Sequence, residues 1–207
     1  MPSIYHITHL RNLAQILGYG SLWCDRERLG QGLESVGIAY QHIKDRRARK
    51  RVPVGLGGTL ADYVPFYFAP RSPMLFAIHR GQVPGYDGGQ SSVVHLVTST
   101  EVVAAEPLPF IFTNGHADMA FSRFYDDLRD LDQVDWVIMG ERYWNDTPED
   151  GDRKRRRQAE FLVHTSLPWR LIEEIGVISR KAADEVAAAL EDAEHRPPVV
   201  VRPEWYY

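Results

Sequence analysis

The sequence predicts a single domain of the α+β class, in which short strands and helices follow one another in irregular order. Three observations lead to this prediction. The chain has 207 residues, a length that suits one large domain, and 44% of them are hydrophobic, which suffices for a substantial core. Runs of β-branched and aromatic residues are interspersed with amphipathic stretches. No internal repeat, low-complexity tract or linker-like stretch divides the chain, so we expect residues 1–207 to form one domain.

Strands are expected where short runs combine β-branched or aromatic residues with alternation or with flanking turn residues. The runs that meet these criteria are residues 3–9 (SIYHITH), 21–24 (SLWC), 63–69 (YVPFYFA), 91–99 (SSVVHLVTS) and 160–167 (EFLVHTSL). A further apolar run, residues 74–80 (MLFAIHR), fits either a strand or a short helix. The glycines of GLGG at residues 55–58 predict a flexible turn between two of these elements.

Helices are expected where apolar residues recur at helical spacing. Thr8 is placed to cap the first helix, and Gly18 or Gly20 to end it. The expected helices are residues 9–17 (HLRNLAQIL), 38–50 (IAYQHIKDRRARK), 119–131 (MAFSRFYDDLRDL) and 180–194, the last with Ala183, Val186, Ala187 and Leu190 turned inward. The polar span 145–157 is expected to be a loop.

The composition excludes several classes of protein. A single cysteine, Cys24, forms neither an internal disulfide nor a multi-cysteine zinc site. The histidines lack metal-ligand spacing such as HExxH, so no metal site is expected, and no GxSxG elbow indicates acyl transfer. No stretch resembles a signal peptide, and no apolar run approaches the roughly 18 residues that span a bilayer. We therefore expect a cytoplasmic protein without a membrane partner.

Charge is unevenly distributed, although the net charge is only −4. Residues 44–51 and 153–157 are basic, and residues 126–152 between them carry an acidic excess. Local patches rather than net charge decide where a polyanion docks. Two interpretations stay open for each basic segment: a solvated surface, or a surface that binds nucleic acid.

Polar side chains near the start of the chain and in the late predicted strand are candidates for a functional site. Glu160 begins an apolar strand, where a carboxylate is either a solvated end residue or a group that points into a cleft. His6 and Thr8 share one face of the first strand, and Asn12 follows one helical turn later. These residues either belong to the core and surface or bind a ribose hydroxyl, to which His6 would donate a hydrogen bond.

An aromatic strand and a proline-rich turn form the third candidate segment. Tyr67 lies near the end of the strand, and Arg71 lies in the turn that follows. Core packing explains the aromatic residues most simply. A planar nicotinamide or adenine ring also needs aromatic walls, and a diphosphate favours an arginine.

Four segments, in this order, resemble the DarT family of DNA ADP-ribosyltransferase toxins: YHITHLRNLAQIL, the basic helix that ends in Arg51, FYFAPRSPML, and RRRQAEFLVH. The resemblance spans nearly the whole chain. It implies the ADP-ribosyltransferase fold, in which two central β-sheets form a split cleft for NAD⁺. It also implies transfer of ADP-ribose from NAD⁺ to thymidine in single-stranded DNA, with release of nicotinamide. A macrodomain antitoxin that removes the modification is the implied partner.

The resemblance also implies which residues form the site. Glu160 matches the essential glutamate of the late strand, and Arg51 matches the catalytic arginine. Gln158 lies where other transferases carry a second glutamate or glutamine, and glutamine resembles the pattern for a neutral acceptor. Tyr67 is expected to stack on the nicotinamide ring. The implied NAD⁺-binding residues are His6, Ile7, Thr8, Asn12, Gly20, Leu22, Arg51 and Tyr67.

The segment before Glu160 is predicted to bind the DNA. Cations there hold phosphates, and aromatic side chains stack on splayed bases at about 1–3 kcal/mol per base. The predicted DNA-binding residues are Arg153, Lys154, Arg155, Arg156, Arg157, Tyr143 and Trp144, with Phe121 as a further candidate for stacking. Two alternatives stay open: a transferase that modifies RNA or protein, and a nucleic-acid-binding domain without enzymatic activity.

Overall fold

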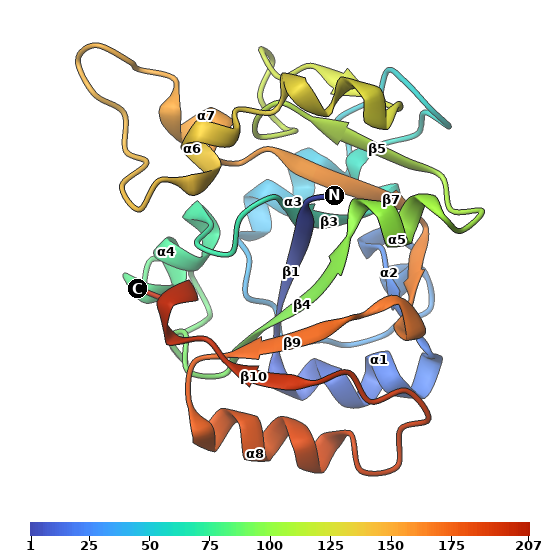
Figure 1. Cartoon of the computed structure of the whole chain (residues 1–207). Helices are drawn as coiled ribbons and strands as arrows, with labels where there is room; N and C mark the ends of the chain where they lie inside the picture. The colour runs from blue at the N-terminus through green and yellow to red at the C-terminus, as the bar shows by residue number, and fades with distance from the viewer.

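The computed structural model describes all residues 1–207 and has a large, mainly antiparallel sheet at its centre (Figure 1). The strands are β1 (Ser3–His9), β2 (Ser21–Trp23), β3 (Tyr63–Tyr67), β4 (Val93–Ser99), β5 (Phe110–Thr113), β6 (Phe124–Tyr125), β7 (Glu160–His164), β8 (Ser166–Pro168), β9 (Glu174–Val177) and β10 (Val199–Val201). The eight-stranded sheet has the order β10-β9-β4-β1-β3-β7-β5-β6, and β2 pairs with β8 in a separate two-stranded sheet. The α+β prediction is confirmed.

Short helices surround this sheet. They are α1 (Leu13–Tyr19), α2 (Asp25–Gly30), α3 (Gln41–Arg47), α4 (Pro73–His79), α5 (Thr100–Ala104), α6 (Trp136–Gly140), α7 (Arg153–Arg156) and α8 (Arg180–Ala189), together with the 3₁₀ turns Leu10–Asn12, Leu60–Asp62, Leu128–Gln133, Trp169–Leu171 and Pro203–Trp205. Figure 1 shows α8 alongside β9 and β10, and α6 and α7 together at the opposite end of the molecule. None of the helices combines the length and the apolar character that crossing a bilayer requires.

The large sheet is almost divided in two at its centre. Strand β1 pairs with β4 along its whole length, and β3 pairs with β7 along its whole length. Between β1 and β3, however, the only register pair is Tyr5 with Tyr67. The two halves therefore diverge from this pair. The split sheet implied by the resemblance takes the form of one sheet whose halves are joined at a single point.

The expected helix at residues 119–131 is wrong. Phe124 and Tyr125 form β6 instead, and the ring of Tyr125 stacks on Phe112 of β5 with centroids 5.2 Å apart. Pairing with β5 leaves Phe124 and Tyr125 partly buried, while Phe121 remains 84% exposed. The helical spacing of the aromatic residues was therefore coincidental, and tertiary pairing decided the local structure.

The first helix differs from the prediction at its start and agrees with it at its end. The side chain of His9, rather than Thr8, accepts a capping hydrogen bond from the backbone N–H of Arg11, at the start of the 3₁₀ turn Leu10–Asn12, and α1 itself has no side-chain cap. Gly20 ends α1 in the left-handed region at φ 62°, as expected for a glycine cap. In α8, Val186 and Leu190 are buried as predicted, whereas Ala187 is exposed.

His95 is a buried polar residue of the core and makes stability depend on pH. Its ring, fully buried on β4, donates from Nε2 to the carbonyl oxygen of Pro70 at 3.0 Å, and its Nδ1 lies 3.2 Å from the Tyr206 hydroxyl. Burial lowers the pKa of His95 from 6.5 to about 4. The native state thus binds this proton less readily than the unfolded chain.

We expect His95 to cost the protein about 3 kcal/mol of stability as the pH falls from about 6.5 to about 4. Above pH 6.5 this loss is absent, because the His95 imidazole is then neutral in both the native and the unfolded state. Urea unfolding at several pH values, with His95→Gln as control, measures it. His95→Gln is expected to be less stable than the wild type at neutral pH, but its free energy of unfolding should fall less on acidification. Parallel pH profiles of the free energy of unfolding for the two proteins would refute the role given to His95.

Candidate active site

A deep pocket opens where the two halves of the sheet diverge. Strands β1, β3 and β7 form its floor, and α1, β2, α3 and residues 33–39 form its walls. Most of the residues predicted to bind NAD⁺ line it: His6, Ile7, Thr8, Asn12, Leu22 and Tyr67. Gly20 caps α1 between two lining residues, Tyr19 and Ser21, without lining the pocket itself. Glu160 also faces this pocket.

Glu160 is held at the pocket floor by hydrogen bonds from three directions. It is the first residue of β7 and is only 3% exposed, so the solvated-end interpretation does not apply. Its backbone N–H donates to Thr113 Oγ1 at 3.1 Å. Its Oε1 accepts the backbone N–H of Ala117 at 3.0 Å, and its Oε2 accepts Nη1 of Arg47 at 2.8 Å. The carboxylate therefore has a fixed orientation.

Arg47, the last residue of α3, supplies the cation beside Glu160. Burial alone would lower the pKa of Arg47, but the charge and hydrogen bond of Glu160 outweigh it and raise the pKa. The guanidinium therefore stays protonated. Its Nη2 is buried and has no hydrogen-bond partner within the protein. A buried unpaired donor is costly unless a ligand satisfies it.

Arg51, predicted as the catalytic arginine, does not reach the pocket. Its side chain is exposed, and its backbone forms an isolated bridge with Thr59. The reason is that α3 ends at Arg47, so Arg51 lies beyond the helix on the outside. The structure thus brings Arg47, and not Arg51, to Glu160.

Two aromatic side chains from the edges of the split complete the floor. His6 donates from Nδ1 to the carbonyl oxygen of Pro65 at 2.8 Å, a bond that crosses the gap between β1 and β3. Burial lowers the pKa of His6, so the ring is neutral and its Nε2 is a hydrogen-bond acceptor rather than the donor that the sequence suggested. Burial, followed by the charge of Glu160, raises the pKa of Tyr67 and keeps the phenol protonated.

Asn12 shapes the pocket wall. Its Nδ2 donates to Thr8 Oγ1 and to the carbonyl oxygen of Val36, both at 3.1 Å, and its Oδ1 accepts the backbone N–H of Val36 at 2.8 Å. The side chain thereby fastens residues 33–39 to the end of β1. Its polar atoms are already occupied, which favours a structural contribution to the site over direct contact with a ligand.

Several residues of the pocket were not predicted from the sequence. His116 lines it beside Glu160, and burial lowers its pKa despite the nearby carboxylate. Trp23 lines the opposite wall, and its buried Nε1–H has no partner. A signal for Arg47 did exist: Ala39, Ile43 and Arg47 are spaced at i, i+4 and i+8, and all three line the pocket. No sequence pattern marked His116 or Trp23.

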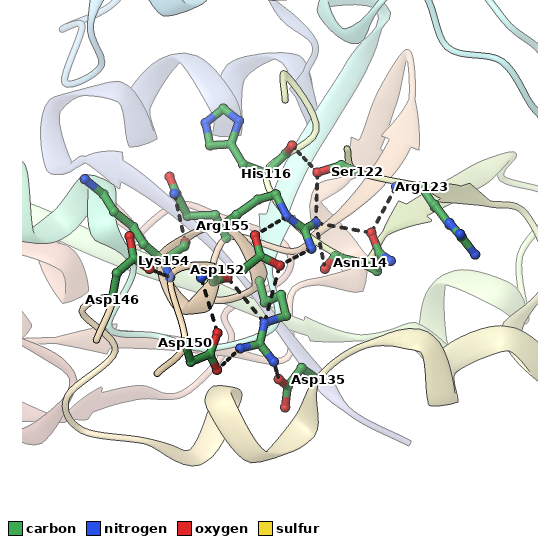
Figure 2. A network of polar contacts seen from close by, with 12 residues as sticks. Asn114, His116, Ser122, Arg123, Asp135, Asp146, Asp150, Asp152, Lys154 and Arg155 are labelled. Carbon is green, nitrogen blue, oxygen red and sulfur yellow. Dashed lines mark hydrogen bonds and ion pairs between the residues drawn. The ribbon is translucent and has the colours of Figure 1, made fainter. Parts of the chain in front are cut away.

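Two arginines of the basic run, Arg155 and Arg156, pair with carboxylates within the protein (Figure 2). Residues 153–156 form α7 instead of the expected loop. The side chain of Arg156 pairs with Asp135 and Asp150, and that of Arg155 pairs with Asp152 at 2.6 Å. The acidic excess noted in the sequence thus supplies the carboxylate partners of Arg155 and Arg156. The predicted clamp is therefore not assembled from these two arginines.

Two further residues predicted to contact DNA, Arg157 and Trp144, make hydrogen bonds within the protein instead. Arg157 is 3% exposed and donates from Nη1 to the carbonyl oxygens of Ile138 and Met139, both at 2.6 Å, at the end of α6. Trp144 is buried and donates to the hydroxyl of Tyr207 at 2.8 Å. The remaining predicted residues keep free surface: Lys154 and Tyr143 are exposed, and Arg153 is partly exposed with its guanidinium on backbone carbonyls.

The structure holds no cluster of three or more histidine, cysteine, aspartate or glutamate side chains arranged for a metal ion. The polar groups of the pocket are instead suited to an organic anion. Arg47 Nη2 and Trp23 Nε1 offer buried donors, and Tyr19, Trp23 and Tyr67 offer aromatic walls. A dinucleotide has both features that these groups bind: aromatic rings, which pack against aromatic walls, and a diphosphate, which accepts hydrogen bonds from buried donors.

The chain is similar to known proteins over nearly its whole length. The family model described as ssDNA thymidine ADP-ribosyltransferase, DarT, matches residues 5–207. A DNA ADP-ribosyl transferase of Thermus sp. (strain 2.9) is 45% identical over 206 residues, which cover 99% of this chain and 95% of the relative.

Solved structures are similar over the full length. The structure of Thermus sp. 2.9 DarT in complex with ADP-ribosylated ssDNA has a TM-score of 0.92 at 45% identity and covers 100% of this chain and 96% of that chain. The structure of Thermus sp. 2.9 DarT in complex with NAD⁺ has a TM-score of 0.87 at 42% identity and covers 100% of this chain and 98% of that chain.

Proposed function

The chain belongs to the DarT family of single-stranded-DNA thymidine ADP-ribosyltransferases, and we propose how its own residues carry out this reaction. It is an NAD⁺-dependent DNA ADP-ribosyltransferase that transfers ADP-ribose to thymidine in single-stranded DNA. The observation that carries our assignment of residues is the buried Arg47–Glu160 pair: both residues line the pocket between the halves of the sheet, and Nη2 of Arg47 has no hydrogen-bond partner.

Glu160 is proposed to promote cleavage of the bond between nicotinamide and ribose. When this bond breaks, its electron pair leaves with nicotinamide, and positive charge develops at the anomeric carbon. A fixed carboxylate that accepts a hydrogen bond from a ribose hydroxyl places negative charge beside that carbon. The carboxylate is held by Arg47 and Ala117, so little reorganisation is needed. An ionised carboxylate keeps acceptor capacity beyond these two bonds.

Arg47 is proposed to orient and stabilise the thymine base during attack. The N3 of thymine forms the new bond to the anomeric carbon and loses its proton, and this N–H is about as weakly acidic as a phenol. Negative charge then spreads over N3 and the carbonyl oxygens. Because the pKa of Arg47 is raised, the guanidinium stabilises this charge and does not itself accept the proton. The proton passes to Glu160 or to water.

The remaining NAD⁺ contacts are assigned from the lining of the pocket. Neutral His6 is proposed to accept a hydrogen bond from a ribose hydroxyl through Nε2, and Tyr67 to stack on the nicotinamide ring. Ile7, Thr8 and Leu22 shape the pocket around the dinucleotide. We also propose that residues 1–207 act as one domain, because the pocket draws on strands and helices from both halves of the chain.

DNA is proposed to approach between the end of α3 and the loop of residues 114–122. Arg46 on α3 pairs with Asp118 on that loop at 2.6 Å, so these segments meet beside Glu160. Beyond α3, Arg49 and Arg51 are exposed and without a carboxylate partner, and are therefore suited to phosphates. On the loop, Phe121 offers an exposed ring for a base. Lys154, Arg153 and Tyr143 are proposed as more distant contacts.

Phe121→Ala is expected to weaken binding of single-stranded oligonucleotides by about 1–3 kcal/mol and to leave the salt dependence of binding unchanged, because stacking neutralises no phosphate. Fluorescence anisotropy over a range of salt concentrations measures both. Tyr19→Ala, on the NAD⁺ side, serves as control for DNA binding. An unchanged affinity for Phe121→Ala would remove this residue from the DNA surface.

The biological setting is proposed from membership of the family. We propose that the protein acts as a toxin, that a macrodomain antitoxin reverses the modification, and that both work in the cytoplasm, where NAD⁺ and DNA are available. Co-expression tests this: toxicity is expected to depend on Glu160 and to be relieved by an active macrodomain. Toxicity of Glu160→Gln equal to that of the wild type would contradict it.

The acceptor is tested with a panel of oligonucleotides. Single-stranded DNA that contains one thymine is incubated with the protein and NAD⁺, beside matched strands with uracil, cytosine or adenine at that position and beside RNA. Mass spectrometry is expected to show one added ADP-ribose on the thymine strand alone. Equal modification of RNA or of cytosine strands would contradict the thymidine assignment.

A further inference from the structure

Arg155 occupies the inside of the loop formed by residues 114–122. Its Nη1 lies 3.3 Å from Ser122 Oγ and 3.4 Å from Asn114 Oδ1, which joins it to both ends of this loop. Its own carbonyl oxygen accepts the backbone N–H of His116 at 2.9 Å. Figure 2 shows the guanidinium among these groups, directed toward the loop.

The loop is shaped to fit this guanidinium. A Cβ atom on Gly115 would lie 2.1 Å from Arg155 Nη1, so no side chain fits between them. On the other side, Asp152 accepts from Nε at 2.7 Å and from Nη2 at 2.6 Å. Two hydrogen bonds in one plane fix the rotation of the guanidinium. Arg155 is thus locked between a carboxylate and the loop backbone.

The same loop holds the catalytic carboxylate. Ala117, at its centre, is fully buried and donates its N–H to Glu160 Oε1 at 3.0 Å. The start of the loop is tied to Glu160 as well, because Thr113 Oγ1 accepts the N–H of Glu160 and donates to the carbonyl oxygen of Gly115 at 2.6 Å. A shift of the loop would therefore displace the bond that orients the carboxylate.

We propose that Arg155 is a positioning residue, which holds the loop of residues 114–122 so that the Ala117 N–H orients Glu160. This inference deepens the proposed function and rests on the role given there to Glu160. It replaces the prediction that Arg155 contacts DNA. Its guanidinium is engaged on both sides within the protein, whereas its neighbour Lys154 is exposed and its side chain has no partner.

Two substitutions of Arg155 separate positioning from DNA contact. Arg155→Met keeps much of the stem and removes the guanidinium, and is expected to lower kcat about 10- to 100-fold with less than threefold change in KM for the oligonucleotide. Arg155→Lys keeps the charge but not the planar fork, and is expected to lose most of the same activity. A phosphate contact would survive in Arg155→Lys, because an ammonium also binds phosphate.

Lys154→Met is the matched comparison, since it removes one charge from the adjacent residue. It is expected to act on DNA affinity, with a higher KM for the oligonucleotide and a salt slope reduced by about 0.7 if one phosphate contact is lost. Normal kcat in Arg155→Met, or a reduced salt slope together with full activity in Arg155→Lys, would overturn the proposal.

Hydrogen exchange reports on the loop independently of activity. In Arg155→Met the amide of Ala117 is expected to exchange at least tenfold faster than in the wild type, while core amides of β4 keep their protection. Gly115→Ala, which displaces the guanidinium without changing it, is expected to have the same effect. Unchanged exchange of Ala117 in both variants would refute the proposal even if the wild-type protein transferred no ADP-ribose. Loss of transfer in the wild type alone would count against the proposed function instead.

Discussion

Glu160→Gln is expected to lower kcat for ADP-ribose transfer about 10²- to 10³-fold, with a change of less than about tenfold in NAD⁺ affinity. The substitution keeps the size of the side chain and an oxygen that accepts from Ala117, but it removes the charge. The charge matters most when positive charge develops on the ribose. Ground-state binding depends mainly on the rest of the pocket, so the effect falls on kcat.

Glu173→Gln is a suitable control for this measurement. Glu173 is exposed and lies outside the pocket, so its substitution is expected to leave both constants unchanged. NAD⁺ affinity is followed by calorimetry, and transfer is followed by the mass of the oligonucleotide. Transfer by Glu160→Gln at close to the wild-type rate would exclude the role that we assign to the carboxylate.

Arg47→Ala is expected to reduce kcat/KM about 10²-fold or more, whereas Arg51→Ala is expected to keep kcat and to change KM for DNA only a few-fold. The two residues lie four positions apart in the same basic segment, so net charge changes equally. Arg47 contacts Glu160 at 2.8 Å, and Arg51 is exposed. Removing Arg47 also leaves the buried carboxylate without its cation.

The control for Arg47 is the conservative substitution. Arg47→Lys keeps a positive charge but offers one ammonium in place of two guanidinium nitrogens, so it is expected to recover only part of the lost activity. Circular dichroism and thermal unfolding confirm that each variant is folded. The opposite order, with Arg51→Ala inactive and Arg47→Ala active, would restore the prediction made from the sequence.

Much of the architecture follows from the local sequence. β1, β3, β4 and β7 lie where alternation and β-branched residues predicted strands, and Gly20 ends α1 as a glycine cap should. The helix expected around Phe124 failed for a physical reason. Periodicity reports which residues are buried together, but not whether a neighbouring strand or a helical turn does the burying.

The site was predictable where residues lie on strands and less so elsewhere. Glu160 and His6 both line the pocket, and strand alternation limits each side chain to one of two faces, although the resemblance was needed to choose the functional interpretation. The sequence did not indicate that Arg47 rather than Arg51 lies beside Glu160, because the end of α3 could not be located to within one turn of helix. The pairing of Arg156 with Asp135 and Asp150 depends on how the chain folds back, which charge counts along the sequence do not contain.

The most direct test of the account is the intact mass of a single-stranded oligonucleotide that contains one thymine, after incubation with NAD⁺ and either the wild type or Glu160→Gln. A gain of one ADP-ribose is expected with the wild type, and essentially none with the variant over the same time. An equal gain with both proteins, or none with the wild type, would contradict it.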